Sequence, residues 1–185
     1  MIVIMLEMFA EQLMARASKR RELSKGSYLF FEGDLVETVF VIDIGLVELS
    51  RRQLDGASIV LQRARRGAVL AESSLYSIAY HCDAIAVEAS TVFQLPKQSF
   101  HAHLDKDRAF AQLWAAHLAR EVRAARMRCE ILSRKTVAER LDGWLAWQDN
   151  NVQEKGRWKS VAEQIGVSPE ALYRELAKRR KKSDK

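Results

Sequence analysis

The spacing of glycine is the feature that most constrains the fold of this 185-residue chain. In the first third of the chain, glycines recur at intervals of 7 to 12 residues, at Gly26, Gly33, Gly45, Gly56 and Gly67. Short apolar or alternating stretches lie between them, namely SYLFF, TVFVIDI, LVELS and SIVLQ. Turn residues at these intervals, separated by β-branched and aromatic runs, indicate antiparallel strands in a sandwich or barrel.

Two flanking segments complete this first region. The stretch AIAVEASTVFQL, residues 84–95, contributes two further strand candidates before Pro96. The N-terminal stretch through Arg21 predicts a short helix packed beside the strands. Together these segments predict one strand-rich domain in the first part of the chain.

The middle of the chain has a helical pattern. No glycine or proline occurs between Pro96 and Gly143, and alanine, leucine and arginine dominate. Small or apolar residues recur there at alternating spacings of four and three, at Ala111, Ala115, Leu118, Val122, Ala125, Cys129 and Leu132. This heptad pattern predicts a helix that pairs with a second copy of the chain, with packing inside its own domain as the alternative. We expect the dimer seam to comprise Leu118, Val122, Ala125, Cys129 and Leu132.

The stretch WKSVAEQIGVSPEALYRELAKRR carries signals for two short helices. Ser160 with Glu163 resembles a capping box, and Ser168 followed by Pro169 predicts a second helix start. Gly166 between them can adopt the left-handed turn that a helix-turn-helix needs. Apolar residues suited to the inner faces are Val161, Ile165, Leu172 and Leu176. The stretch therefore predicts a helix-turn-helix.

The end of the chain is strongly basic. Residues 174–185 hold seven basic and two acidic residues, whereas the formal net charge of the whole chain is only +6. Such a cluster suits an anionic polymer, with a solvated terminal tail as the alternative. Next to a helix-turn-helix, it favours double-stranded DNA as the partner. The residues expected to bind DNA are Ser168, Pro169, Glu170, Tyr173, Arg174, Lys178, Arg179 and Arg180.

Several function classes lack the residues they require. There is no P-loop, no spaced pair of carboxylates and no metal-ligand cluster, so we expect neither an enzyme nor a metal site, and no cofactor. Cys82 and Cys129 are the only cysteines, too few for a four-thiolate iron–sulfur cluster. The apolar start MIVIML is too short to span a bilayer and lacks the features of a secretory signal. We expect a cytoplasmic bacterial protein without a membrane partner.

The order of these segments resembles the cyclic-AMP receptor protein and FNR (Crp/Fnr) family of bacterial transcription regulators. The resemblance rests on KGSYLFFEGD, VFVIDIGLVELSRR, residues 71–84 and SVAEQIGVSPEALYREL. It implies an α+β fold in three parts: a sensory β-roll of the double-stranded β-helix type at 1–106, a dimerisation helix at 107–135, and a helix-turn-helix without an evident wing at 136–185. It also implies a homodimer on a palindromic operator, with RNA polymerase as a further partner if the protein activates transcription.

The resemblance assigns particular roles within the C-terminal region. By it, Glu170 and Arg174 occupy positions that contact base edges, which suits the hydrogen-bonding chemistry of both side chains. The family commonly follows its second helix with a β-hairpin wing, whereas this chain continues as LAKRRKKSDK. We expect the basic tail to replace the wing by binding phosphates.

The segment AESSLYSIAYHCDA, residues 71–84, falls where the family places its phosphate-binding cassette. By the resemblance, Glu72 matches a carboxylate that bonds a ribose hydroxyl. The family usually has glycine directly before this glutamate, whereas this chain has Ala71. The family also has an arginine and a serine or threonine that bind the cyclic phosphate, and this chain has Cys82 and Asp83 in their places. We therefore expect a degenerate pocket, and an effector other than cyclic AMP whose identity stays open. The pocket residues are Ala71, Glu72, Ser73, Ser74, Cys82 and Asp83.

Two alternatives remain for this segment. Bulky side chains such as Tyr76 and Tyr80 could fill the pocket, leaving no room for an effector. His81 or Cys82 could instead serve as a haem or metal ligand, because imidazole and thiolate both bind iron. The chain would then be a ligand- or redox-sensing module that acts through a protein partner.

Overall fold

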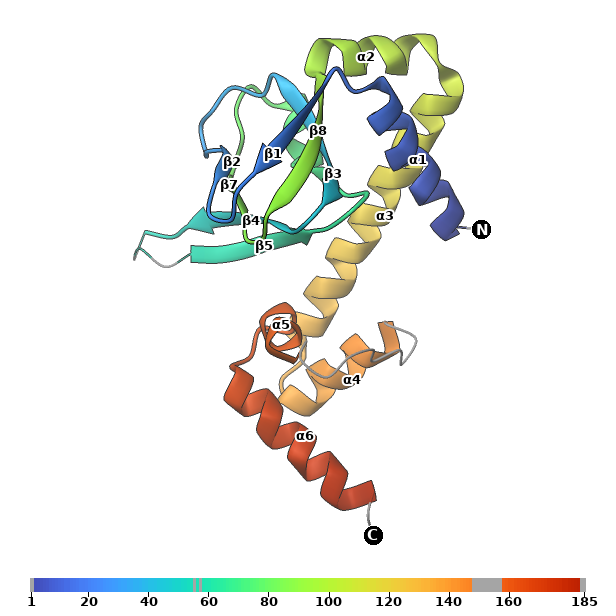
Figure 1. Ribbon diagram of the computed structural model, residues 1–185. Helices are drawn as coiled ribbons and strands as arrows, with labels where there is room; N and C mark the ends of the chain where they lie inside the picture. Colours follow the sequence, from blue (N-terminus) through green and yellow to red (C-terminus); the bar gives the residue numbers. More distant parts are fainter. Residues whose placement is uncertain (1, 55, 57, 148–157, 184–185) are drawn as a thin grey trace. The chain divides into compact units, whose positions relative to one another are not determined.

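The computed structural model describes residues 2–54, 56, 58–147 and 158–183 (Figure 1). The chain divides into two compact units, Met1–Leu118 and Ala119–Lys185. Antiparallel strands dominate the first unit, whereas the described part of the second is helical. The predicted α+β fold with an N-terminal β-roll is therefore confirmed. The end of the predicted basic tail, residues 184–185, lies outside the described residues.

The strands of the first unit form two four-stranded antiparallel sheets. One has the order β1 (Lys19–Leu23), β8 (Ser90–Pro96), β3 (Thr38–Ile44) and β6 (Val69–Leu70). The other has the order β2 (Tyr28–Phe30), β7 (Asp83–Ala86), β4 (Val47–Arg52) and β5 (Ser58–Ala64). Every predicted strand segment is confirmed, because each overlaps one or two of these strands.

The N-terminal prediction was partly wrong. Helix α1 spans Ile2–Arg16, and the residues after it form β1. The sequence KRREL of β1 exposes its first four residues and buries only Leu23. Its strand conformation comes from backbone pairing with β8, which a charged sequence does not reveal.

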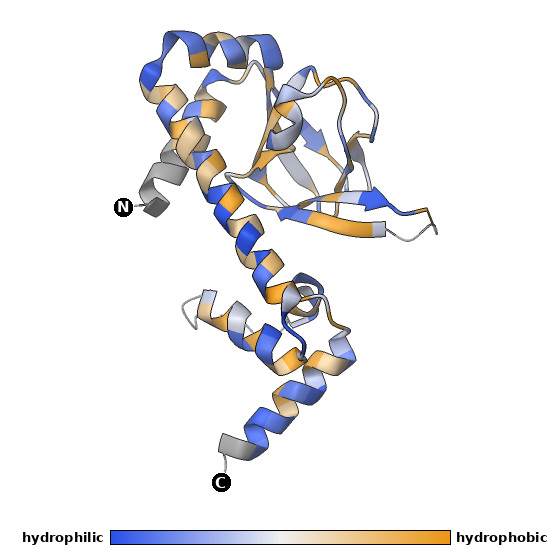
Figure 2. Ribbon diagram, turned by 180° about the vertical axis from the view of Figure 1, so that it is seen from behind, coloured by the Kyte–Doolittle hydropathy of each residue, from blue (hydrophilic) through white to orange (hydrophobic). Residues whose placement is uncertain are grey.

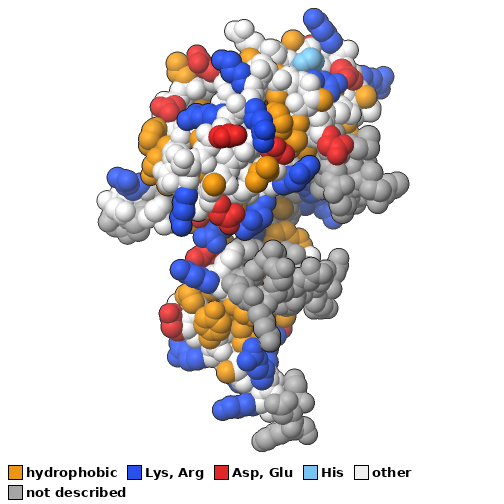
Figure 3. All heavy atoms as spheres, in the orientation of Figure 1, with side chains coloured by type: hydrophobic (Ala, Val, Ile, Leu, Met, Phe, Trp, Pro, Cys, Tyr) orange, Lys and Arg blue, Asp and Glu red, His pale blue; other side chains and the backbone are white. Residues whose placement is uncertain are grey.

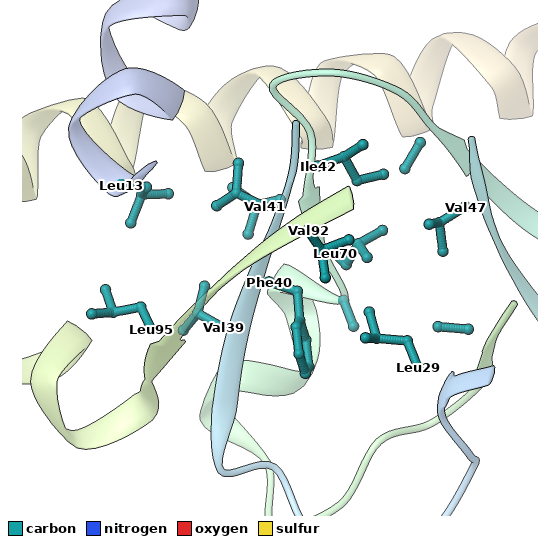
Figure 4. Packing of buried hydrophobic residues seen from close by; sticks show 14 of the residues in the cluster. Leu13, Leu29, Val39, Phe40, Val41, Ile42, Val47, Leu70, Val92 and Leu95 are labelled. Atoms are coloured by element: carbon teal, nitrogen blue, oxygen red, sulfur yellow. The ribbon is translucent and has the colours of Figure 1, made fainter. Parts of the chain in front are cut away.

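A single hydrophobic core joins the two sheets (Figure 4). The central strand β3 buries four consecutive residues, Val39, Phe40, Val41 and Ile42, because it is covered on both faces. Helices α1 and α2 (Lys97–Lys106) both contact β3 and β8. From α1, Phe9 and Leu13 join this core.

Helix α3 (Arg108–Ser133) is continuous across the boundary between the units, and α4 (Val137–Trp147), α5 (Trp158–Gln164) and α6 (Pro169–Ser183) follow it. The second unit has its own core, formed by Ile131, Leu141, Trp144, Val161, Ala162, Ile165 and Leu172. The predicted inner-face residues Val161, Ile165 and Leu172 are confirmed as buried. None of the described helices combines the length and apolar character needed to cross a membrane.

Candidate nucleic-acid interface and ligand segment

A tight turn joins α5 to α6. Gly166 has φ of +65°, which favours glycine, and a Cβ atom there would lie 2.7 Å from Cδ2 of Leu132, so the leucine side chain would have to move. Nη1 of Arg140 donates hydrogen bonds to the carbonyls of Ile165 (3.2 Å) and Gly166 (2.9 Å). This arrangement fixes the geometry between the two helices.

The two predicted helix starts had different outcomes. The Ala171 amide donates to Oγ of Ser168 at 3.2 Å, so the cap of α6 is confirmed. The capping box at Ser160 was wrong, because α5 already begins at Trp158. Ser160 instead accepts a hydrogen bond from Nε2 of Gln164 at 3.3 Å.

Helix α6 presents a polar face to solvent. Glu170, Arg174, Lys178 and Lys181, spaced four, four and three residues apart, are all exposed. Figure 3 shows Lys and Arg side chains along this helix, and Figure 2 shows its mainly hydrophilic character. Hydrogen bonds from its own backbone amide and from Ser168, together with the charge of Arg174, lower the pKa of the Glu170 carboxyl. This face therefore pairs one carboxylate with several cations.

The other predicted DNA-binding residues lie at different positions around α6. Tyr173 is 51% exposed, Arg180 is exposed and Pro169 is half-buried. Arg179 has partners inside the unit, because Nη1 donates to Asp142 (2.6 Å), Nε donates to Glu175 (2.8 Å) and Nη2 donates to the Ala138 carbonyl (3.0 Å).

The ligand segment begins with a strained residue. Ala71 has φ of 51° and ψ of 41°, the left-handed region, immediately before the short helix η1 (Glu72–Tyr76). It is the sole non-glycine residue with positive φ in the described parts of the chain, and it is buried. This conformation costs an L-residue about 1–2 kcal/mol. The backbone thus keeps a shape suited to glycine although the residue is alanine.

His81 joins η1 to the strands. Its Nδ1 lies 2.5 Å from Oγ of the buried Ser74, and its Nε2 lies 3.5 Å from Oγ of Ser73. Nε of Arg51, on β4, donates to the His81 carbonyl at 2.9 Å. Burial, then the positive charge of Arg51, lower the pKa of the His81 imidazole. The ring is therefore held neutral near pH 7.

Cys82 directly precedes β7, and Asp83 is the first residue of that strand. Cys82 is fully buried in the core, and burial raises the pKa of its thiol to about 11. A buried, protonated thiol is a poor nucleophile, which opposes a redox role for Cys82. The Asp83 carboxylate accepts a hydrogen bond from the Glu32 amide at 2.8 Å. Within the described residues, no three His, Cys, Asp or Glu side chains form a metal-binding group.

The two tyrosines of the segment have opposite environments. Tyr80 is buried, stacks on Phe30 with ring centroids 3.7 Å apart, and donates to the Thr38 carbonyl at 2.8 Å. Tyr76 is 64% exposed, and its hydroxyl accepts a hydrogen bond from Nε1 of Trp114 on α3 at 3.0 Å. Tyr80 is therefore a core residue, whereas Tyr76 lies largely in solvent.

The predicted seam residues lie on α3 in differing environments. Val122 (49%) and Leu132 (44%) are exposed, as are Ala125 and Cys129. Leu118 is half-buried and packs against the core of the first unit. Cδ2 of Leu132 also lies 2.7 Å from the point that a Cβ atom of residue 166 would occupy.

Comparisons with known proteins agree with this architecture. Residues 20–107 match the model of the cyclic nucleotide-binding domain family. The chain is 28% identical, over 124 residues, to the cyclic AMP receptor protein of Thermus thermophilus; the match covers 66% of this chain and 57% of that relative.

Two solved structures illustrate the likeness in fold. FixK2 from Bradyrhizobium japonicum has a TM-score of 0.70 at 22% identity, over 89% of this chain and 85% of the other. The c-di-GMP responsive global regulator CLP of Xanthomonas campestris has a TM-score of 0.67 at 16% identity, over 95% of this chain and 92% of the other. Residues 20–107 therefore match the cyclic nucleotide-binding domain family, and the fold of the chain is similar to those of FixK2 and CLP.

Proposed function

We propose that this chain is a homodimeric transcription regulator that reads a palindromic DNA site with α6, here called the recognition helix. The observation that carries the proposal is the exposed face of α6, where Glu170, Arg174, Lys178 and Lys181 follow a glycine turn fixed by Arg140. The Crp/Fnr-type relatives support the same conclusion.

Each exposed side chain suits a different part of DNA. The guanidinium of Arg174 can donate two parallel hydrogen bonds to guanine in the major groove. The ionised Glu170, one helical turn earlier, can accept a hydrogen bond from the amino group of cytosine. Lys178 and Lys181, farther along the helix, suit phosphates, which position the helix without specifying sequence.

Dimerisation is proposed to occur along α3. Val122, Ala125 and Cys129 are exposed in the single chain and continue the heptad pattern of the sequence. Burial of apolar surface between two copies provides a driving force. A two-fold symmetric dimer would present two recognition helices to two half-sites about one helical turn apart.

The proposed signal acts on residues 71–84 and is a ligand other than cyclic AMP. No cation stands at position 82 to pair with a cyclic phosphate, since Cys82 is buried in the core and Asp83 is acidic. The Trp114–Tyr76 hydrogen bond connects this segment to α3. A change in η1 would thereby shift the population of α3 conformations that permit DNA binding.

The proposal is tested by selecting genomic DNA fragments with the purified full chain and sequencing the retained fragments. A palindrome with half-sites about one helical turn apart would support it. A protein-contact module would retain no specific sequence. Adding cyclic AMP during the selection should leave the retained fragments and their amounts unchanged.

A further inference from the structure

We propose that Arg179 is a positioning residue that holds the recognition helix in place and does not contact DNA. This inference rests on the proposed function, because it concerns how α6 is held for reading DNA. It differs from the role that the basic tail suggests, in which every cation near the end of α6 binds phosphate.

The position of Arg179 around the helix is the first argument. Successive residues of an α-helix are about 100° apart, so residues seven apart lie nearly on one line. Arg179 follows the fully buried Leu172 by seven residues and the partly buried Leu176 by three. It therefore lies on the inner face, whereas Arg174 and Lys178 lie on other faces of the helix and are exposed.

The contacts of Arg179 are the second argument. Nη1 donates to the Asp142 carboxylate at 2.6 Å and Nη2 donates to the Ala138 carbonyl at 3.0 Å, and both partners belong to α4. Nε donates to Glu175, one turn earlier on α6, at 2.8 Å. All three nitrogens of the planar guanidinium are thus used to fasten α6 to α4. A lysine ammonium lacks this fork and cannot reproduce the three contacts.

Charge is the third argument. A phosphate approaching Arg179 would have to displace the two carboxylates that already neutralise it, Asp142 and Glu175. Arg180, the next residue, is exposed. The chain therefore offers a matched pair of neighbouring arginines on different faces of one helix.

The test compares wild type with Arg179→Lys, Arg179→Gln, Asp142→Asn and Arg180→Gln, all in the full chain. Affinity is measured across a salt series for a fragment retained by the wild type and for a scrambled fragment of equal length. Far-UV circular dichroism and thermal unfolding establish that each variant is folded at the assay temperature.

We expect Arg179→Lys, Arg179→Gln and Asp142→Asn to weaken binding to the retained fragment by about fivefold, the upper range for a part-exposed ion pair. Their affinity for the scrambled fragment and their salt slope should not change. Arg180→Gln should weaken binding to both fragments and lower the salt slope by about 0.9, as loss of one phosphate contact does. Asp142→Asn is the sharpest variant, since removing a negative charge would by itself strengthen DNA binding.

The inference is overturned if Arg179→Lys binds like wild type, if Asp142→Asn binds more tightly, or if Arg179→Gln lowers the salt slope as Arg180→Gln does. Each of these outcomes would make Arg179 a phosphate contact or a residue without a role in binding. If the wild type itself retains no specific fragment, the proposed function fails, and the inference fails with it. Failure of the proposed function can be told apart from failure of the inference alone, because it is seen with the wild type before any variant is measured.

Discussion

The indole nitrogen of Trp114 on α3 donates a hydrogen bond to the hydroxyl of Tyr76 at the end of η1, over 3.0 Å. Trp114 is 3% exposed and lies against Phe9, Phe100 and His117. One polar contact thus connects the candidate ligand segment to the start of the long helix, inside an aromatic cluster.

Replacing Tyr76 with phenylalanine should lower the free energy of unfolding of the first unit by about 1 kcal/mol, because the indole N–H loses its acceptor. This loss is at the low end of the roughly 1–3 kcal/mol that a buried donor without an acceptor costs, because Tyr76 is exposed and water can reach the vacated position. Urea unfolding measures the loss. In a Trp114→Phe background the same replacement should cost almost nothing, and an equal cost in both backgrounds would exclude the coupling.

Replacing Gly166 with alanine should destabilise the second unit by about 2 kcal/mol. The positive φ contributes about 1–2 kcal/mol, and the close approach of Leu132 Cδ2 adds to it. Denaturant unfolding of the full chain provides the measurement. In a Leu132→Ala background the glycine replacement should cost less, since the clash is removed, and an unchanged cost would assign the whole effect to backbone strain.

Replacing Val122 with glutamate should convert the proposed dimer to a monomer. Val122 is 49% exposed in the single chain, so the change does not disturb a core. The analogous change at Leu118 is less informative, because Leu118 packs against the first core. Sedimentation equilibrium measures the mass of both proteins.

Cys129 offers an independent check of the same seam. Identical residues of a parallel helix pair lie opposite each other, so mild oxidation should join two wild-type chains through Cys129, and Cys129→Ser should abolish the product. A Val122→Glu variant that remains a dimer, or cross-links as efficiently as wild type, would contradict the seam.

Stability should fall at acidic pH because of His81. Burial and Arg51 lower the pKa of its imidazole in the folded chain below the ordinary value of 6.5, so the unfolded chain binds the proton more readily. The contribution of His81 is therefore fully present above pH 6.5 and is lost as the pH falls below it. Urea midpoints between pH 8 and pH 5 should decrease more for wild type than for His81→Gln. Parallel pH profiles would show that His81 plays no part.

Much of the fold was accessible from the sequence because turns and apolar runs alternate in its first half. The strands around Val39 and Val92 follow directly from β-branched runs. Strand β1 did not, since its pairing with β8 depends on tertiary contacts that KRREL does not encode in its hydropathy. The start of α5 was also misplaced, because a serine three residues before a glutamate occurs inside helices as well as at their ends.

The candidate site was harder to predict from the sequence than the fold. Residue identity suggested that Arg179 and Arg180 have the same role, although helical periodicity from Leu172 would have separated them. Cys82 was placed in a pocket by resemblance, but a small apolar thiol beside a strand is easily accommodated in a core, where it is found. Alanine itself does not predict the left-handed conformation of Ala71, because it disfavours it, and the signal was the glycine that the resembling family usually has at this position.

The most direct test of the account is binding of the purified chain to its retained palindrome and to the same DNA with one half-site scrambled. If two recognition helices read two half-sites, scrambling one half introduces several mismatched base pairs, each of which costs about 1–3 kcal/mol. Binding should therefore weaken at least about a hundredfold. The loss should be equal whichever half is scrambled. Equal affinity for intact and half-scrambled DNA would contradict a dimeric reader.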